Sequence, residues 1–137
     1  MILRPASEQD LPAIAEIQAA AIEASQWNPE DYLAHNCEVA VVDGAVVGFL
    51  VARPVAEKEW EILNLAVAPR ARRKGVGRQL LRGVLSRYPG DFFLELRESN
   101  LGARAFYEHL GFEVVASRTR YYSGPEESAL VMKFQSC

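Results

Sequence analysis

Two glycines, Gly75 and Gly77, mark the part of the sequence that is best suited to hold a phosphate group. They follow a break at Pro69 and open a segment in which apolar residues recur at helical spacing. Glycine lets main-chain N–H groups approach a ligand closely, and the first amides of a helix lack intrahelical partners and carry partial positive charge. This pattern predicts a phosphate or pyrophosphate site. Basic side chains add to the charge there: Arg70, Arg72, Arg73, Lys74 and Arg78.

Two familiar phosphate-binding motifs do not explain this segment. The sequence contains no G-x-x-x-x-G-K-[ST] run, and Leu80 stands where the dinucleotide fingerprint needs its third glycine. If the charges are considered alone, a solvated basic turn is the alternative interpretation.

The elements that must position these residues alternate between strands and helices. The helix at 75–87 lies between two apolar strands, at 59–67 and 92–97, which we therefore expect to be parallel. Asp43-Gly44 indicates the tight turn of a hairpin. The other expected strands are 2–4, 38–42, 46–52, 113–120 and about 128–134, the last two joined through Ser123-Gly-Pro125.

Capping residues indicate where the helices begin and end. A first helix is expected after Ser7, and Asn28-Pro29 begins a short second helix that ends near His35 or Asn36. The last helix runs from about Asn100 to Leu110 and ends at Gly111. This order predicts an α/β (α+β) fold, a three-layer mixed sheet with helices on both faces.

Length and composition favour one domain, residues 1–137, of ordinary globular type. The formal net charge of −3 argues against direct nucleic-acid binding, although a binder that uses the basic turn stays open. Two cysteines, Cys37 and Cys137, are too few for a disulfide scaffold, and no cluster suggests a metal site. With no signal peptide and no apolar run of about 20 residues, we expect a cytoplasmic protein that does not enter membranes.

Two blocks of the sequence resemble one family. Arg72-Arg-Lys-Gly75-Val-Gly77 is similar to the [RQ]-x-x-G-x-[GA] acetyl-coenzyme A signature of the GNAT superfamily of N-acetyltransferases. The segment 94–112, with Glu95, Asn100 and Tyr107-Glu-x-Leu-Gly-Phe112, resembles that family's later strand and helix. With Arg120-x-Tyr-Tyr122 and the ending 129–132, the pattern is closest to the ribosomal-protein-alanine N-acetyltransferases of bacteria. It implies the GNAT acyl-CoA N-acyltransferase fold and acetyl-CoA as cosubstrate.

The resemblance implies where the coenzyme lies. Backbone groups of Leu65, Ala66 and Val67 would pair with the pantetheine arm, along a strand that diverges from its parallel neighbour. Asn100 would contact the coenzyme from the other side, although it could simply cap its own helix. The residues that would hold the pyrophosphate are Arg73, Lys74, Gly75, Val76, Gly77 and Arg78.

The sequence shows no Ser/His/Asp or Cys/His constellation for a covalent acetyl-enzyme, so we expect a direct transfer with one base and one acid. Strand alternation places Glu95 opposite Leu94 and Leu96, where a partly desolvated carboxylate with a raised pKa could act as general base through a water. A glutamate paired with Arg97 or a lysine is the alternative. Tyr107 corresponds to the family's general acid, although its helical spacing is also that of a packed aromatic. Glu61, on the preceding strand, is the second candidate for the base, or it could bind the amino terminus of the acceptor.

The sequence says least about which amine accepts the acetyl group. An α-amine with a pKa of about 7.7–8.0 is far more often neutral at pH 7 than a lysine amine near 10.4, so one modest base favours a peptide N-terminus. The implied acceptor is the N-terminal alanine of a ribosomal protein, and Trp27, Tyr121 and Tyr122 could wall its groove or simply pack over the core. A small-molecule or lysine acetyltransferase and a non-catalytic CoA-binding sensor are the alternatives.

Overall fold

A computed structural model describes residues 1–21, 24, 26–122 and 127–135, and for 120–122 the backbone only. The expected connection at 123–125, the terminal Cys137 and the Tyr121 and Tyr122 side chains therefore lie outside the described part. The strands are β1 (Ile2–Pro5), β2 (Asn36–Val42), β3 (Ala45–Ala56), β4 (Glu59–Val67), β5 (Asp91–Arg97), β6 (Glu113–Tyr122) and β7 (Glu127–Phe134). The α-helices are α1 (Leu11–Ala20), α2 (Val76–Arg87) and α3 (Leu101–His109).

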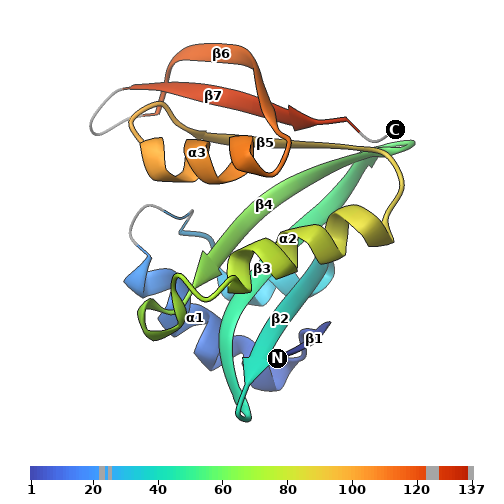
Figure 1. Cartoon of the computed structure of the whole chain (residues 1–137), viewed down its shortest axis with the longest axis vertical. Coiled ribbons are helices and arrows are strands. Elements are labelled where there is room, and N and C mark those ends of the chain that lie inside the picture. Colours follow the sequence, from blue (N-terminus) through green and yellow to red (C-terminus); the bar gives the residue numbers. More distant parts are fainter. Residues whose placement is uncertain (22–23, 25, 123–126, 136–137) are drawn as a thin grey trace. The chain divides into compact units, whose positions relative to one another are not determined.

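The strands form a mixed sheet in the order β1-β2-β3-β4-β5-β7-β6 (Figure 1). β4 and β5 are parallel, with Trp60 opposite Phe92, because α2 connects them as a crossover. The neighbouring pairs β1–β2, β2–β3, β5–β7 and β6–β7 are antiparallel. The mixed sheet and the order of elements agree with the sequence prediction.

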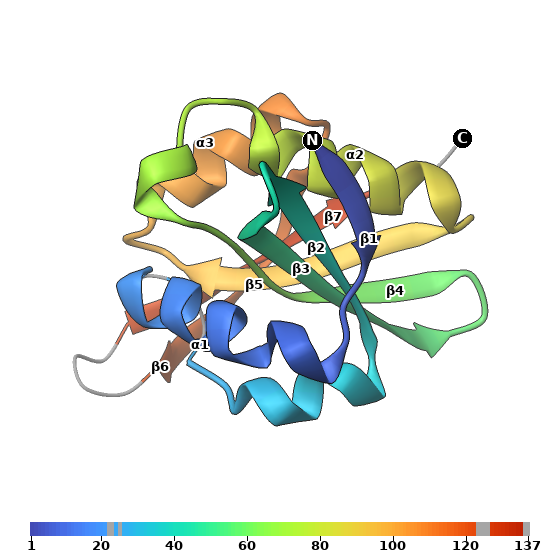
Figure 2. The same ribbon diagram turned by 90° about the horizontal axis from the view of Figure 1, so that it is seen from below.

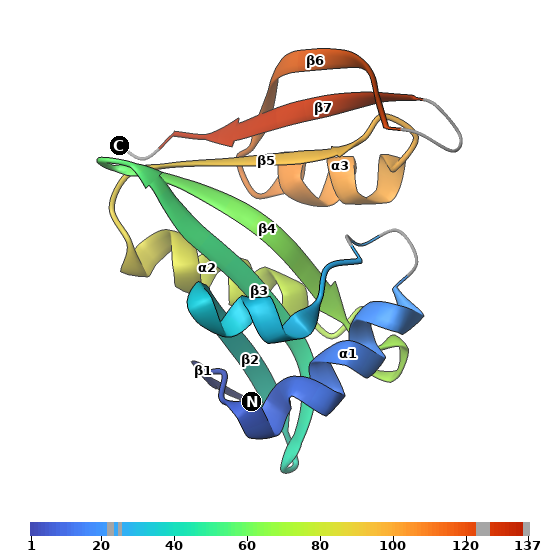
Figure 3. The same ribbon diagram turned by 180° about the vertical axis from the view of Figure 1, so that it is seen from behind.

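The chain divides into two compact units, which are described separately. The first comprises Met1–Arg53 and Ile62–Tyr88. Its part of the sheet carries α1 and the 3₁₀ segment η2 (Pro29–Ala34) on one face and α2 on the other (Figures 1–3). A core under α1 and η2 contains Ile14, Ile17, Tyr32, Cys37, Val39, Phe49, Val51, Ala66 and Ala68.

The second unit comprises Pro54–Glu61 and Pro89–Cys137. In it, α3 lies along β5 and β7 (Figures 1 and 3). The Phe112 ring, just after α3, is fully buried and lies with its centroid 5.5 Å from that of Phe134 on β7. Gly111 has φ +100°, so the glycine lets the chain leave the helix in the left-handed region, as expected.

One predicted helix differs in type. The segment after Asn28 is a 3₁₀ helix, η2, and the i→i+3 bonds from Asp31 N to Asn28 O (3.0 Å) and from His35 N to Tyr32 O (3.0 Å) mark its two ends. Asn28 caps it by accepting from Glu30 N (3.2 Å). Six residues make fewer than two turns of an α-helix. The i→i+3 bonds of a 3₁₀ helix give more of its backbone groups a partner, and the segment still buries Tyr32.

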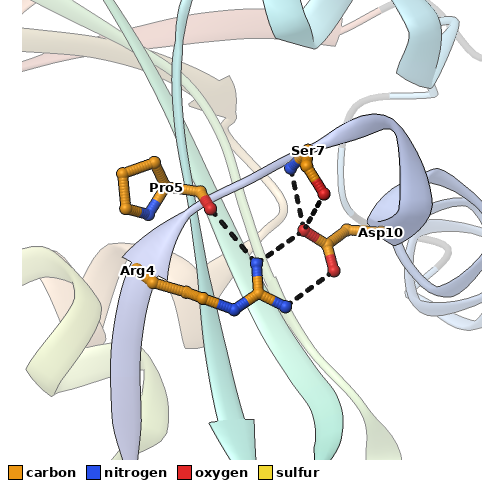
Figure 4. Close-up of polar contacts among 4 residues, drawn as sticks. All are labelled: Arg4, Pro5, Ser7 and Asp10. Atoms are coloured by element: carbon orange, nitrogen blue, oxygen red, sulfur yellow. Dashed lines mark hydrogen bonds and ion pairs between the residues drawn. The ribbon is translucent and has the colours of Figure 1, made fainter.

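The start of α1 is fixed to β1 by an ion pair. Arg4 donates from both terminal nitrogens to the Asp10 carboxylate, at 2.8 and 2.9 Å, and Ser7 donates its main-chain N–H to the same carboxylate at 2.8 Å (Figure 4). The Arg4 hydrogen bond, with help from Ser7, holds the pKa of Asp10 below its usual value, although burial opposes this shift.

This lowered pKa predicts a loss of stability in acid. The folded state binds the Asp10 proton less tightly than the unfolded chain, so the contribution is complete above the unfolded pKa of about 3.9 and is lost as pH falls toward the lower folded pKa. We expect the free energy of unfolding, measured by urea titration between pH 6 and 2.5, to show this decline. Asp10→Asn should remove the part of the pH dependence that Asp10 contributes. Asp43→Asn, a change in an exposed turn, should keep the wild-type slope.

Candidate functional site

The start of α2 presents main-chain donors to one side. Gly75 precedes the helix with φ +80°, and Arg73 also has a left-handed φ of +64°. Alternation of left-handed and helical residues turns successive N–H groups into an anion-binding concavity. The first intrahelical bond of α2 runs from Gln79 N to Gly75 O (3.0 Å), so the three preceding amides have no acceptor within the helix. This geometry is one that suits an anion, and the phosphate site stays a prediction.

The basic side chains of the turn have different tasks. A Cβ built on Gly75 would lie 3.3 Å from Nη2 of Arg78, so this guanidinium lies against the helix start. Arg72 instead turns back and donates from Nε to the Val67 carbonyl at 3.3 Å. Arg72 thus braces the turn against β4, whereas Arg78 adds charge where an anion would lie.

Gly48 on β3 brings α2 close to the sheet. A Cβ at this buried position would lie 3.0 Å from Cγ1 of Val76 and 3.3 Å from the Ala66 carbonyl oxygen. The first turn of α2 therefore packs directly over β3 beside β4. This packing brings the pyrophosphate candidates and the pantetheine candidates together in the first unit.

The edge of β4 away from β3 carries the backbone groups of Leu65 and Val67. Ala68 donates its N–H to Val47 O on β3 at 2.8 Å. Because backbone groups of successive strand residues point to opposite edges, those of Leu65 and Val67 point away from β3. The Leu65 N–H donates to the Asn64 side-chain oxygen at 3.0 Å. With Arg72 on the Val67 carbonyl, the Leu65 carbonyl and the Val67 N–H are the edge groups suited to an amide-bearing arm.

Glu95 lies on β5 in the second unit and forms an ion pair. Phe92, Leu94 and Leu96 are buried and Glu95 faces the other way, as the alternation predicted. Its Oε1 accepts from Nη1 of Arg118 on β6 at 2.7 Å, and its side chain is 25% exposed. Arg97, the partner named in the alternative interpretation, donates to Glu127 at 3.0 Å. The contact between the Arg118 guanidinium and the Glu95 carboxylate is a charge-assisted hydrogen bond across the hairpin strands.

Tyr107 lies on α3 in the same unit, within an aromatic group. Its ring centroid is 5.2 Å from that of Phe106 and 5.4 Å from that of Phe112, both edge-on. Burial raises the pKa of Tyr107 well above its ordinary value, so the phenol keeps its proton at neutral pH. The ring makes the packing contacts, so the predicted role as a proton donor would fall to the hydroxyl alone.

Asn100 caps α3, which was the simpler of its two predicted roles. Its side-chain oxygen accepts from Ala103 N at 3.1 Å, and its amide nitrogen is a donor that suits a coenzyme contact. The preceding turn is held by Glu127, which accepts from Ser99 N and from Ser99 Oγ, each at 3.1 Å. Arg97 holds the pKa of Glu127 below its usual value.

The remaining candidate residues are Glu61, Trp27 and Cys37, which lie in different segments of the chain. Glu61 is partly buried on β4 and, with 59 and 60, belongs to the second unit. Trp27 lies in the first unit and is 52% exposed. The thiol of Cys37 is buried in the core, and burial raises its pKa to about 12, which leaves it protonated and poorly nucleophilic.

Two features were missed from the sequence. Arg118 comes from β6, with β7 between it and β5, so no local spacing links it to Glu95. A buried amide network, Gln18 with Tyr32 and Asn64, was also missed. Asn64 interrupts the apolar run of β4, and a polar residue in a buried strand requires partners, so a signal was present.

Comparison with known proteins decides the family. The model of the acetyltransferase (GNAT) family matches residues 5–112. The chain belongs to the GNAT family. A ribosomal protein bS18-alanine N-acetyltransferase from Salmonella typhimurium is 31% identical over 92% of this chain and 91% of the relative. An N-alpha-acetyltransferase from Saccharolobus solfataricus is 31% identical over 69% of this chain and 66% of the relative.

The fold of this GNAT acetyltransferase is also that of solved relatives. The crystal structure of Ard1 from Thermoplasma volcanium is 30% identical, with a TM-score of 0.90, over 99% of this chain and 97% of that one. Family, fold, reaction type and acetyl-CoA as cosubstrate thus agree with the sequence prediction. Within the described residues, no helix is both long enough and apolar enough to span a bilayer.

Proposed function

We propose that this GNAT acetyltransferase acetylates the α-amine of a peptide N-terminus, most specifically an N-terminal alanine of a ribosomal protein or a similar peptide. The observation that carries the proposal is that one partly exposed carboxylate, Glu95, and one phenol kept protonated by a raised pKa, Tyr107, occur in the same unit of a chain of the acetyltransferase family. A single carboxylate is a modest base, and a modest base suits an amine that is already partly neutral. The names of the two relatives from Salmonella and Saccharolobus support the same acceptor class.

Acetyl-CoA supplies the acetyl group as a thioester. Main-chain donors at 76–78 and the Arg78 guanidinium would hold its pyrophosphate, with Arg73 and Lys74 adding charge. Leu65 and Val67 on β4 would pair with the pantetheine amides, and the amide nitrogen of Asn100 would add a contact. Each of these groups has the donor or acceptor character that the coenzyme requires.

The two catalytic residues divide the proton transfers. Glu95 accepts a proton from the acceptor ammonium through one water, which frees the nitrogen lone pair. The nitrogen–carbon bond then forms, and the carbon–sulfur bond breaks as Tyr107 donates its proton to the departing sulfur. The second proton that the nitrogen loses on becoming an amide restores the Tyr107 phenol. Because Arg118 binds Oε1 of Glu95, the base uses its other oxygen or releases Arg118 first.

A peptide assay tests the acceptor. Purified protein is incubated at pH 7 with acetyl-CoA and an alanine-initiated peptide that also contains a lysine, and the products are mapped by mass spectrometry. We expect acetyl on the α-amine alone, because roughly a tenth of α-amines are neutral at this pH and far fewer lysines are. Transfer only to the lysine or to a polyamine control would favour the alternative acceptors, and coenzyme binding without any transfer would favour a sensor.

A further inference from the structure

Glu95 and Arg118 meet across an intervening strand of the second unit. Because β7 lies between β5 and β6, the Arg118 side chain passes over β7 before its Nη1 donates to Oε1 of Glu95 at 2.7 Å. Adjacent strands lie about 4.8 Å apart, so roughly 10 Å separates the backbones of β5 and β6. A long side chain is needed to cross this distance, and β6 supplies an arginine.

The register of the strands suits this crossing. Arg118 is opposite Ala129 on β7, and Glu95 is opposite Val131 on the same strand. Directly opposed side chains, and those two residues apart on one strand, lie on one face of a sheet, so these four share a face. Val131 offers Glu95 no hydrogen-bonding group, and the small Ala129 leaves space for the arginine stem. The pairing of β6 with β7 is irregular between Arg118 and Tyr122, and such irregularities can re-aim a side chain.

Folding stability alone does not account for the Glu95–Arg118 pair. The side chain of Arg118 is 52% exposed and that of Glu95 is 25% exposed, and ion pairs this open to solvent add little to stability. Arg97, two residues along β5 from Glu95, donates to Glu127 on the adjacent strand β7. The partner of Glu95 comes from one strand farther away. What this contact fixes is Oε1, and with it the direction of the Glu95 carboxylate.

We propose that Arg118 is a positioning residue that holds the Glu95 carboxylate in the orientation from which it accepts the acceptor's proton. The inference rests on the proposed function, in which Glu95 is the base, and it adds the residue that orients this base. A general base must lie within hydrogen-bond reach of the proton or of one water, and a small misplacement lowers the rate strongly. Because Arg118 acts through Glu95, its loss should lower kcat and leave the binding of peptide and coenzyme almost unchanged.

Steady-state kinetics with the alanine-initiated peptide test this inference on the full chain. Arg118→Leu removes the guanidinium and keeps much of the stem. We expect kcat to fall about tenfold to thirtyfold, with the peptide KM and the Kd for acetyl-CoA within about twofold of wild type. Arg118→Lys keeps the positive charge but loses the planar fork, so its kcat should lie between those of Arg118→Leu and wild type.

The matched control is Arg104→Leu on α3. Arg104 forms a surface pair with Glu108 at 3.4 Å, and its side chain is about as exposed as that of Arg118. The change therefore removes the same charge and the same kind of contact from the same unit without touching Glu95. It should leave kcat at the wild-type value, and both leucine variants should melt close to the wild-type temperature.

A double-mutant cycle separates an effect through Glu95 from an independent one. In a Glu95→Gln background, Arg118→Leu should cause no further loss of kcat, because no base is left to orient. Multiplying losses would overturn the positioning role, as would an Arg118→Leu enzyme whose kcat is unchanged or higher, or one in which only the peptide KM rises. In each of these cases the wild type still acetylates the peptide, so the proposed function stands. A wild type that transfers no acetyl to any peptide would reject the proposed function and this inference with it.

Discussion

Glu95→Gln and Tyr107→Phe are each expected to lower kcat about a hundredfold or more, while the Kd for acetyl-CoA stays close to that of wild type. Glutamine cannot accept the amine proton, and phenylalanine cannot donate one to the sulfur. The Tyr107 ring packs edge-on against Phe106 and Phe112, so phenylalanine keeps these contacts. The loss of rate should therefore come without a large change in melting temperature. Stopped assays for kcat and calorimetry for the coenzyme would measure both.

The control for charge is Glu108→Gln on the same helix as Tyr107. Glu108 forms a surface pair with Arg104 at 3.4 Å, so its loss removes the same charge with little expected effect on rate. A normal kcat in both Glu95→Gln and Tyr107→Phe would contradict the assignment. If Glu61→Gln gave the larger loss, the base would be Glu61 and not Glu95.

Gly90→Ala is expected to cause one of the largest losses of stability for a single methyl group. Gly90 joins α2 to β5 with φ +127°, and a Cβ there would lie 2.2 Å from the carbonyl oxygen and 2.6 Å from the carbonyl carbon of Lys58. The same Lys58 carbonyl accepts from Asp91 N at 2.9 Å, so it cannot move without loss of this bond. The strained backbone costs about 1–3 kcal/mol and the overpacking about as much again.

Gly102→Ala is the matched change, because it adds the same methyl group on α3 with nothing within 4 Å. Alanine in a helix should raise the free energy of unfolding by roughly 0.5–1 kcal/mol. Urea titrations of the two variants and the wild type would measure these opposite shifts. A Gly90→Ala protein as stable as the Gly102→Ala protein would show that the chain can relax at Gly90.

Local signals in the sequence predicted the helices and strands, and also the glycine turn before α2 in the candidate site. The alternation in 59–67 gave the bounds of β4, and Gly75 and Gly111 stand where the backbone is left-handed. These features depend on a few neighbouring residues and on the periodicity of a strand or helix, so they can be predicted without a fold. The capping role of Asn100 and the facing of Glu95 belong to the same class.

Contacts between distant segments were decided by the tertiary structure alone. Arg118 reaches Glu95 from a strand that pairs with β7, and Gln18, Tyr32 and Asn64 meet from three separate elements. The pairing of buried donors with buried acceptors depends on how whole strands and helices pack against one another. A short stretch of sequence therefore does not predict these partners. The sequence therefore supplied the chemical groups of the site, and the packing of strands and helices chose the partners that hold them.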